Sequence, residues 1–114
     1  MEDCLFCKIA AKKTPARIVH EDDLIVAFED IRPQAPTHIL IIPREHFASL
    51  ADVPAEKADI LSRLLLTAQT IARDREISRS GYRIVLNTGR DSGQAVFHIH
   101  FHLLGGRSMS WPPG

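Results

Sequence analysis

Near its carboxyl end the chain reads Phe97-His98-Ile99-His100-Phe101-His102-Leu103-Leu104. Alternation of apolar and polar residues predicts a half-buried strand, because successive side chains of a strand point to opposite faces. We therefore expect a strand over 97–104, with its apolar residues on the core and its histidines in a row on the other face. Neighbouring imidazoles in that row would have Cα atoms about 6.8 Å apart, from a rise of about 3.4 Å per residue.

A row of histidines suits catalysis, since imidazole titrates near neutrality and can serve as nucleophile, base, acid or metal ligand. The preceding segment, Asn87 to Gln94, is polar and contains Gly89 and Gly93, whose backbone N–H groups can turn toward an anion. Together the two features indicate phosphoryl or nucleotidyl chemistry. The structural alternatives are histidines on a solvent-washed edge strand and hydrogen-bonded histidines in a core strand. The sequence has neither a Walker motif nor a dinucleotide-binding glycine pattern.

Outward from this segment, the sequence predicts one α+β domain over residues 1–114. Apolar residues at three- and four-residue spacing predict a long helix from Pro54 to about Arg75, and Cys4 to Lys12 suits a short one. Strands are predicted at 17–20, 24–28, 37–42, 82–86 and 97–104. Short connections among the first three favour antiparallel pairing, so we expect a sheet with helices on one face.

The composition is that of an ordinary globular domain. Of 114 residues, 45% are apolar and 25% are charged, and 14 basic residues balance 14 acidic ones. Zero net charge argues against long-range attraction to nucleic acid or an acidic membrane surface. The longest apolar run, Leu24 to Phe28, is far shorter than the ~18 residues of a membrane span. With an acidic amino end that does not resemble a secretory signal, we expect a cytoplasmic protein with no membrane or nucleic-acid partner.

A Cys-x-x-Cys pair, Cys4 and Cys7, lies in the predicted short helix. Positions i and i+3 share one side of a helix, so both sulfurs can bind one ion, with histidines available to complete a tetrahedral zinc site. The alternatives are a disulfide, a thioredoxin-type redox pair and two unrelated buried cysteines. The expected cytoplasmic setting disfavours the first, and the lack of a βαβ context disfavours the second.

The segment from Gln94 to Leu104 resembles the His-φ-His-φ-His-φ-φ signature of the histidine triad (HIT) superfamily, where φ is apolar. Two further stretches, Phe28 to His38 and Gly105 to Gly114, are similar to its nucleotide-binding (Hint) branch. The resemblance spans nearly the whole chain. It implies a homodimer in which two five-stranded antiparallel sheets join into one. It also implies a hydrolase without organic cofactor that binds purine nucleoside monophosphates such as AMP and cleaves P–N bonds of nucleoside phosphoramidates.

The same resemblance assigns roles to four histidines. It implies that His100 is the nucleophile, which attacks the α-phosphorus and forms a nucleotidyl-histidine intermediate. A neutral imidazole suits such a two-step displacement. His98 would buttress the site, His102 would touch the phosphate, and His38 would complete a hydrogen-bond relay with the nucleophile.

The nucleoside contacts are also implied by the resemblance. Asp30 would accept both ribose hydroxyls, with turn capping as its alternative role. The base would enter an apolar slot, for which ordinary core packing is the alternative, formed by Phe6, Ile9, Phe28 and Ile31. Trp111, in the Pro-rich tail, either reaches the partner subunit's site or belongs to a frayed terminus.

The phosphate cradle implied by the resemblance consists of Asn87 and the turn Gly93-Gln94-Ala95. Many Hint proteins carry a hydroxyl or acidic side chain where Ala95 stands. Loss of a hydrogen bond to a charged group, worth ~1.5–3 kcal/mol, would lower the rate by about ten- to a hundredfold.

The Cys pair is shared with a number of bacterial triad proteins that bind zinc with two further histidines. Transferred to this chain, that pattern gives Cys4, Cys7, His46 and His98 as ligands of a structural zinc ion, since four protein ligands leave no position for water. Three alternatives compete with a phosphoramidate hydrolase. They are a dinucleoside polyphosphate hydrolase, a nucleotide-binding regulatory module with vestigial catalysis, and a catalytic metal site on the triad itself.

Overall fold

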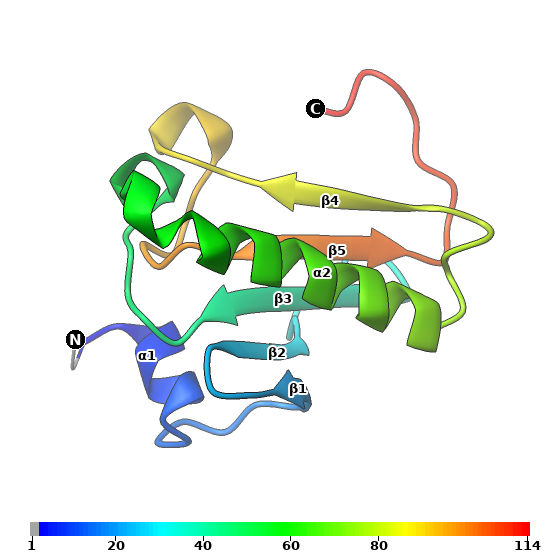
Figure 1. Ribbon diagram of the computed structural model, residues 1–114. Helices are drawn as coiled ribbons and strands as arrows, with labels where there is room; N and C mark the ends of the chain where they lie inside the picture. The colour runs from blue at the N-terminus through cyan, green and yellow to red at the C-terminus, as the bar shows by residue number, and fades with distance from the viewer. Residues whose placement is uncertain (1–2) are drawn as a thin grey trace.

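The computed structural model describes residues 3–114, in which five strands form one antiparallel sheet in the order β1-β2-β3-β5-β4 (Figure 1). The strands are β1 (Ile18–Glu21), β2 (Ile25–Glu29), β3 (Thr37–Pro43), β4 (Tyr82–Leu86) and β5 (Phe101–Gly105), and the helices are α1 (Leu5–Ala10) and α2 (Ala58–Asp74). Short 3₁₀ turns lie at Leu50–Asp52, Ala55–Lys57 and Arg90–Ser92. The predicted five-stranded α+β fold is confirmed.

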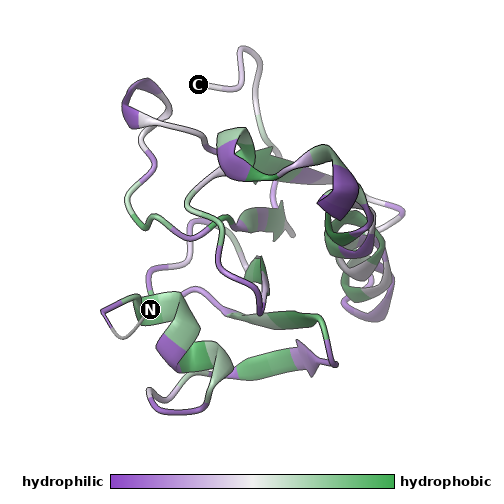
Figure 2. Cartoon of the chain, turned by 60° about the vertical axis from the view of Figure 1, so that its left-hand side comes forward, coloured by the Kyte–Doolittle hydropathy of each residue, from purple (hydrophilic) through white to green (hydrophobic). Residues whose placement is uncertain are grey.

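The two helices lie on opposite sides of the sheet (Figure 2). Helix α2 packs its apolar stripe, which includes Leu64 and Ala68, against residues of one face such as Ile39 and Leu103. Helix α1 packs Phe6 and other apolar residues against the alternate residues of β2 and β3. The expectation that helices cover only one face is therefore wrong. Because β2 and β3 are apolar at nearly every position, both of their faces need a cover.

Helix α1 is six residues long and covers only the half of its face that β2 and β3 form. On the other half of this face, His102 and Leu104 of β5 and the residues of β4 paired with them, Arg83 and Val85, are only partly buried. We call this region the open half of the sheet, and the candidate site described below lies there.

The predicted boundaries differ most at the histidine segment. Strand β5 begins at Phe101, whereas the alternation predicts a start at Phe97, and Phe97 is 60% exposed. The reason lies in the backbone pairing, since the Ile99 N–H donates to the Phe47 carbonyl, 2.7 Å away, instead of to a neighbouring strand. Residues 98–100 thus cross out of the sheet, and the three histidines do not form one regular row.

The long helix also differs slightly from its prediction. Pro54 stands in extended conformation before the 3₁₀ turn, and α2 proper starts at Ala58. It ends at Asp74, one residue from the predicted end, and Glu76 beyond it takes a positive φ of 59° that helical residues cannot adopt. Within residues 3–114, neither helix has the length and apolar character to cross a membrane.

Candidate functional site

Three of the predicted histidines meet at the open half of the sheet. His38 lies on β3 and His102 on β5, while His100 stands just before β5 begins. The ring centroids of His38 and His102 are 5.2 Å apart, and those of His100 and His102 are 5.0 Å apart. The sheet therefore assembles an imidazole cluster from segments more than sixty residues apart in sequence.

All three rings have a pKa below the usual histidine value, which favours the neutral form at physiological pH. Burial lowers the pKa of His38 and of His100 below the usual histidine value, although the nearby Asp30 carboxylate opposes the shift. Burial also lowers the pKa of His102 to about 4, with repulsion from His100 and His38 adding to the effect. A neutral imidazole carries one N–H and one lone pair, so the partner of either nitrogen determines the tautomer.

The tautomer of His100 leaves its Nε2 free to react. Its Nδ1 lies 2.7 Å from the backbone carbonyl oxygen of His98. A carbonyl oxygen only accepts, so Nδ1 carries the proton and donates it. The lone pair therefore sits on Nε2. The ring itself is held by edge-on packing against Phe6, at a centroid distance of 5.1 Å.

In His102 the Nε2 atom carries the proton, whereas in His100 the same atom carries the lone pair. The Gln34 backbone N–H donates to His38 Nδ1 at 3.0 Å, so the His38 proton is on Nε2. That Nε2–H donates to His102 Nδ1 at 2.9 Å, which leaves the His102 proton on Nε2. Thus His100 presents a lone pair and His102 presents an N–H donor. His38 bonds His102, and the structure gives it no direct bond to His100.

Asp30, directly after β2, has two contacts. Its Oδ1 accepts the Arg32 N–H at 2.8 Å, which caps the turn, as the alternative role predicted. Its Oδ2 lies 3.5 Å from His38 Nε2. The carboxylate, 19% exposed, thus sits at the rim of the imidazole cluster with acceptor capacity remaining.

The four residues predicted to hold the base are divided between core and surface. Phe6, Ile9 and Phe28 are at most 6% exposed and belong to the α1 core cluster, where Phe6 and Phe28 pack edge to face at 5.4 Å. Ile31, in the loop after β2, is 91% exposed. Core packing therefore explains the burial of three of them, and Phe6 also touches the ring of His100. The role of the four residues in a base slot stays a prediction.

The sequence predicted that the loop 87–94 turns its glycine N–H groups toward an anion. In the structure these groups bind acceptors within the loop instead. The Gly93 N–H donates to the Arg90 carbonyl, and the Gln94 N–H donates to the Gly89 carbonyl. The Gly89 N–H donates to Gln94 Oε1, while Gln94 Nε2 donates to the carbonyls of Ala48 and Val96. A short loop satisfies its own backbone in this way, so Gln94 is a structural residue. The roles of Asn87 and Ala95 in a phosphate cradle stay predictions.

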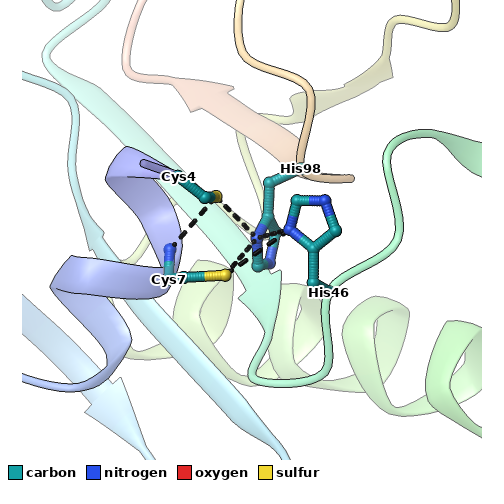
Figure 3. Close-up of side chains that lie close together, drawn as sticks. All are labelled: Cys4, Cys7, His46 and His98. Carbon is teal, nitrogen blue, oxygen red and sulfur yellow. Dashed lines mark hydrogen bonds between the residues drawn. The ribbon is translucent and has the colours of Figure 1, made fainter. Parts of the chain in front are cut away.

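The third triad histidine, His98, belongs to a different cluster. Figure 3 shows its ring beside Cys4, which caps the start of α1, beside Cys7 of α1 and beside His46, and the four ligand atoms lie within 4.8 Å of one another. His98 Nε2 donates to the Pro43 carbonyl at 2.8 Å, so its Nδ1 lone pair faces the sulfurs. Burial raises the pKa of the Cys7 thiol to about 11 and lowers that of His98 to about 4.

This cluster fits a tetrahedral zinc ion. Zinc bonds of about 2.3 Å to sulfur and about 2.0 Å to nitrogen place S and N ligands about 3.6 Å apart and two N ligands about 3.3 Å apart. The Sγ–Nδ1 distance is 3.3 Å from Cys4 to His98 and 3.5 Å from Cys7 to each of His98 and His46. The Nδ1 atoms of His46 and His98 are 3.1 Å apart. Both cysteines are free, and no disulfide joins them.

The tail residue Trp111 is 81% exposed. The tail is held through the Ser110 carbonyl, which accepts from Arg83 Nη2 at 3.0 Å. The predicted role of Trp111 in a partner subunit's site stays a prediction.

Sequence reasoning missed Gln34 and the carbonyls of Pro43 and His98. Each acts through a backbone group, which every residue type provides, so no side-chain pattern marks it. The only sequence signal near Gln34 is its position between Pro33 and Pro36 in a rigid loop.

With this geometry established, the chain can be compared with known proteins. The model of the HIT domain matches residues 11–109. The chain belongs to the HIT domain family. Purine nucleoside phosphoramidase of Escherichia coli strain K12 is 49% identical over 108 residues, which are 95% of this chain and 91% of that protein.

Solved HIT structures agree with this assignment. A HIT family hydrolase from Legionella pneumophila is 53% identical, with a TM-score of 0.96 over 98% of this chain and 100% of that one. A Zn-bound histidine triad family protein from Mycobacterium smegmatis is 36% identical, with a TM-score of 0.82 over 93% of this chain and 76% of that one. The resemblance inferred from the sequence is confirmed.

Proposed function

We propose that the protein hydrolyses the P–N bond of purine nucleoside phosphoramidates through a covalent nucleotidyl intermediate on His100. One observation carries the proposal. The His98 carbonyl binds the Nδ1–H of His100 and leaves a lone pair on Nε2, next to a ring whose Nε2 carries a proton. A nucleophile beside a hydrogen-bond donor is the arrangement that phosphoryl transfer requires.

In the first step, His100 Nε2 attacks phosphorus and forms an N–P bond. The His102 Nε2–H donates to a phosphoryl oxygen and stabilises its charge. The P–N bond of the substrate breaks, and the amine leaves with the electron pair and takes a proton from water. The imidazolium that results on His100 keeps its Nδ1–H on the His98 carbonyl, a bond that strengthens with the charge.

In the second step, the hydroxide left by that water attacks phosphorus, and the electron pair of the N–P bond returns to His100 Nε2. The products are the nucleoside monophosphate and the free amine. Throughout, His102 acts as a donor only. Its Nδ1 accepts from His38, whose own Nδ1 accepts from an amide that cannot release a proton, so full transfer from His102 would leave an imidazolate.

The nucleoside is proposed to lie on the β2 side of the cluster. Asp30 retains an acceptor for ribose hydroxyls beside His38, and the exposed Ile31 adjoins it in sequence. The aromatic side chains of this slot would be Phe6, which packs edge-on against His100, and Phe28, which packs against Phe6. Purine binding in such a slot rests on stacking and buried area, which suits either purine. The activity named for the Escherichia coli relative supports this substrate class.

The proposal is tested by trapping the intermediate. The protein is mixed briefly with a labelled adenosine phosphoramidate, quenched without acid and digested, and we expect an adenylyl group on the peptide that contains His100. His100→Ala should abolish both adduct and turnover, whereas His20→Gln, on the edge strand β1, should keep both. Turnover that persists in His100→Ala, or an adduct elsewhere, contradicts the mechanism. Faster AMP release from a diadenosine polyphosphate than from the amidate would favour the alternative hydrolase.

We also propose that Cys4, Cys7, His46 and His98 hold a structural zinc ion. The support is the fit of their distances, the free lone pair of His98 and the Zn-bound relative. Zinc would supply a cross-link between α1 and the segment that leads into β5, and it would hold both sulfurs as thiolates.

A homodimer that pairs β4 with its copy is proposed from the sheet topology. Strands β1 and β4 are the edges of the sheet in residues 3–114. The β1 edge is guarded by a register shift and by ion pairs of Glu21 and Arg17. The β4 edge, Tyr82 to Leu86, carries a single charged residue, and α2 nearby in the chain exposes Leu65 and Leu66 by 47% and 57%. An unguarded edge is the usual place for continuation of a sheet.

A further inference from the structure

The turn that follows β5 lies against the loop that orients His38. Gly106 has a φ of 89°, and a Cβ at this position would stand 3.0 Å from the Cβ of Pro36. The next residue, Arg107, donates from Nε to the Gln34 carbonyl oxygen at 2.7 Å. Two adjacent residues of one turn thus contact both ends of the segment 34–36.

The contact with Gln34 is one step from the imidazole cluster. The Gln34 backbone N–H donates to His38 Nδ1, and His38 Nε2–H donates to His102 Nδ1. Arg107 and His38 thus bind the two peptide groups that flank the Cα of Gln34, and the backbone of Gln34 links the two hydrogen bonds. If that backbone changes its φ or ψ, His38 loses the partner that keeps its proton on Nε2.

We propose that Arg107 is a positioning residue of the site, which holds the backbone of Gln34 through its carbonyl so that the Gln34 N–H sets the tautomer of His38 and, through it, of His102. Arg107 touches neither the cluster nor the open half of the sheet through any bond of its own. Its planar guanidinium donates in two directions, to the Gln34 carbonyl from Nε and to the Ser108 carbonyl from Nη1 at 3.1 Å. This fork fixes the loop relative to the turn.

Arg83 supplies a matched comparison. It lines the same groove of about 300 Å³ as Arg107 and Ser108. Like Arg107 it donates to a backbone carbonyl of the tail, that of Ser110. Within residues 3–114, its side chain forms no hydrogen bond with Gln34. Neither arginine forms an ion pair within residues 3–114, so removal of either one leaves no unpaired carboxylate.

The test reads the tautomers directly. Two-bond ¹H–¹⁵N spectra of the histidine rings are recorded at about pH 8, where histidines are neutral, for the wild type, Arg107→Gln, Arg107→Lys and Arg83→Gln. We expect the Nε2–H tautomer of His38 and His102 in the wild type and in Arg83→Gln, and a mixture of tautomers in Arg107→Gln. Arg107→Lys retains one donor and should restore part of the wild-type spectrum.

The consequence for catalysis rests on the proposed function. In Arg107→Gln we expect kcat for an adenosine phosphoramidate to fall about ten-fold with KM changed less, as is usual when a donor is displaced by a fraction of an ångström. Wild-type His38 and His102 spectra in Arg107→Gln, or an equal change in Arg83→Gln, would overturn the proposal. Should Arg107→Gln not fold, Arg107→Lys carries the same comparison. Altered tautomers in a protein without phosphoramidase activity would refute the proposed function and leave the role of Arg107 standing.

Discussion

His98, His100 and His102 have the same type of side chain, yet each ring presents a different atom to its surroundings. The carbonyl of Pro43 turns the lone pair of His98 toward the cysteines, and the carbonyl of His98 turns that of His100 toward Nε2. His102 accepts from His38 and keeps an outward N–H. At the scale of single residues, hydrogen-bond partners therefore give three identical side chains three different presentations, which suit the proposed metal ligand, the proposed nucleophile and a donor.

The lowered pKa values of His38 and His102 predict a stability that depends on pH. In the unfolded chain both rings take up protons near pH 6.5, whereas in the folded protein His102 does so only at about 4. The unfolded state thus binds more protons over this window, and the free energy of unfolding should decrease as pH falls from about 6.5 toward 4. Urea denaturation at intervals across that range measures it.

The matched variant for this prediction is His102→Gln, which removes one of the titrating groups. Its free energy of unfolding should decrease less steeply with falling pH than that of the wild type. Equal slopes for the two proteins would show that His102 is not neutral in the folded state at these pH values.

At the scale of elements, α1 is too short to be stable alone, since isolated helices below ~12 residues are marginal in water. Its support comes from packing of Phe6 and Ile9 and from the cluster of Cys4 and Cys7 with two histidines. A metal that binds only the folded state adds to stability.

We therefore expect Cys7→Ser to lower the Tm by at least about 5 °C, which corresponds to roughly 1 kcal/mol for a chain of this size. The purified wild type should contain about one zinc ion per chain, and the variant should have lost it. Leu5→Ala, a change at a 47% exposed position of the same helix, serves as control and should keep the metal. A wild-type protein that contains no zinc even after incubation with the ion, or a Cys7→Ser variant whose Tm equals that of the untreated wild type, would rule out the zinc site.

At the scale of the whole molecule, the sheet has one guarded edge and one bare edge, β4. The proposed dimer predicts a particle of twice the 12.8 kDa chain mass in light scattering after size exclusion. Leu65→Glu combined with Leu66→Glu should shift it toward the monomer, because charges at an apolar contact are desolvated without partners.

The control pair for the dimer is Ile18→Glu with Leu24→Glu, which alters two exposed apolar residues of the β1–β2 hairpin at the opposite end of the sheet (Figure 1). It should leave the mass unchanged. A wild-type protein that is monomeric at micromolar concentration would contradict the dimer.

Much of the fold could be predicted from periodicity. The strand at 82–86 agrees with β4 at both ends, and the long helix follows its apolar stripe. The prediction was wrong where tertiary pairing overrides a local pattern: the alternation over 97–104 begins four residues before β5 does, because Ile99 pairs with Phe47.

The sequence by itself determined the α+β class, the family and the residue types that gather at the site, because periodicity and side-chain chemistry are local properties of the chain. Only the tertiary structure decided that His98 faces the cysteines and that the N–H groups of the loop 87–94 donate to acceptors within the loop. It also decided that Gln34 and Arg107 lie beside the imidazole cluster. These outcomes depend on backbone carbonyls and amides brought together from distant segments. Such groups are the same in nearly every residue, so their partners are defined by the fold and by no pattern of side chains.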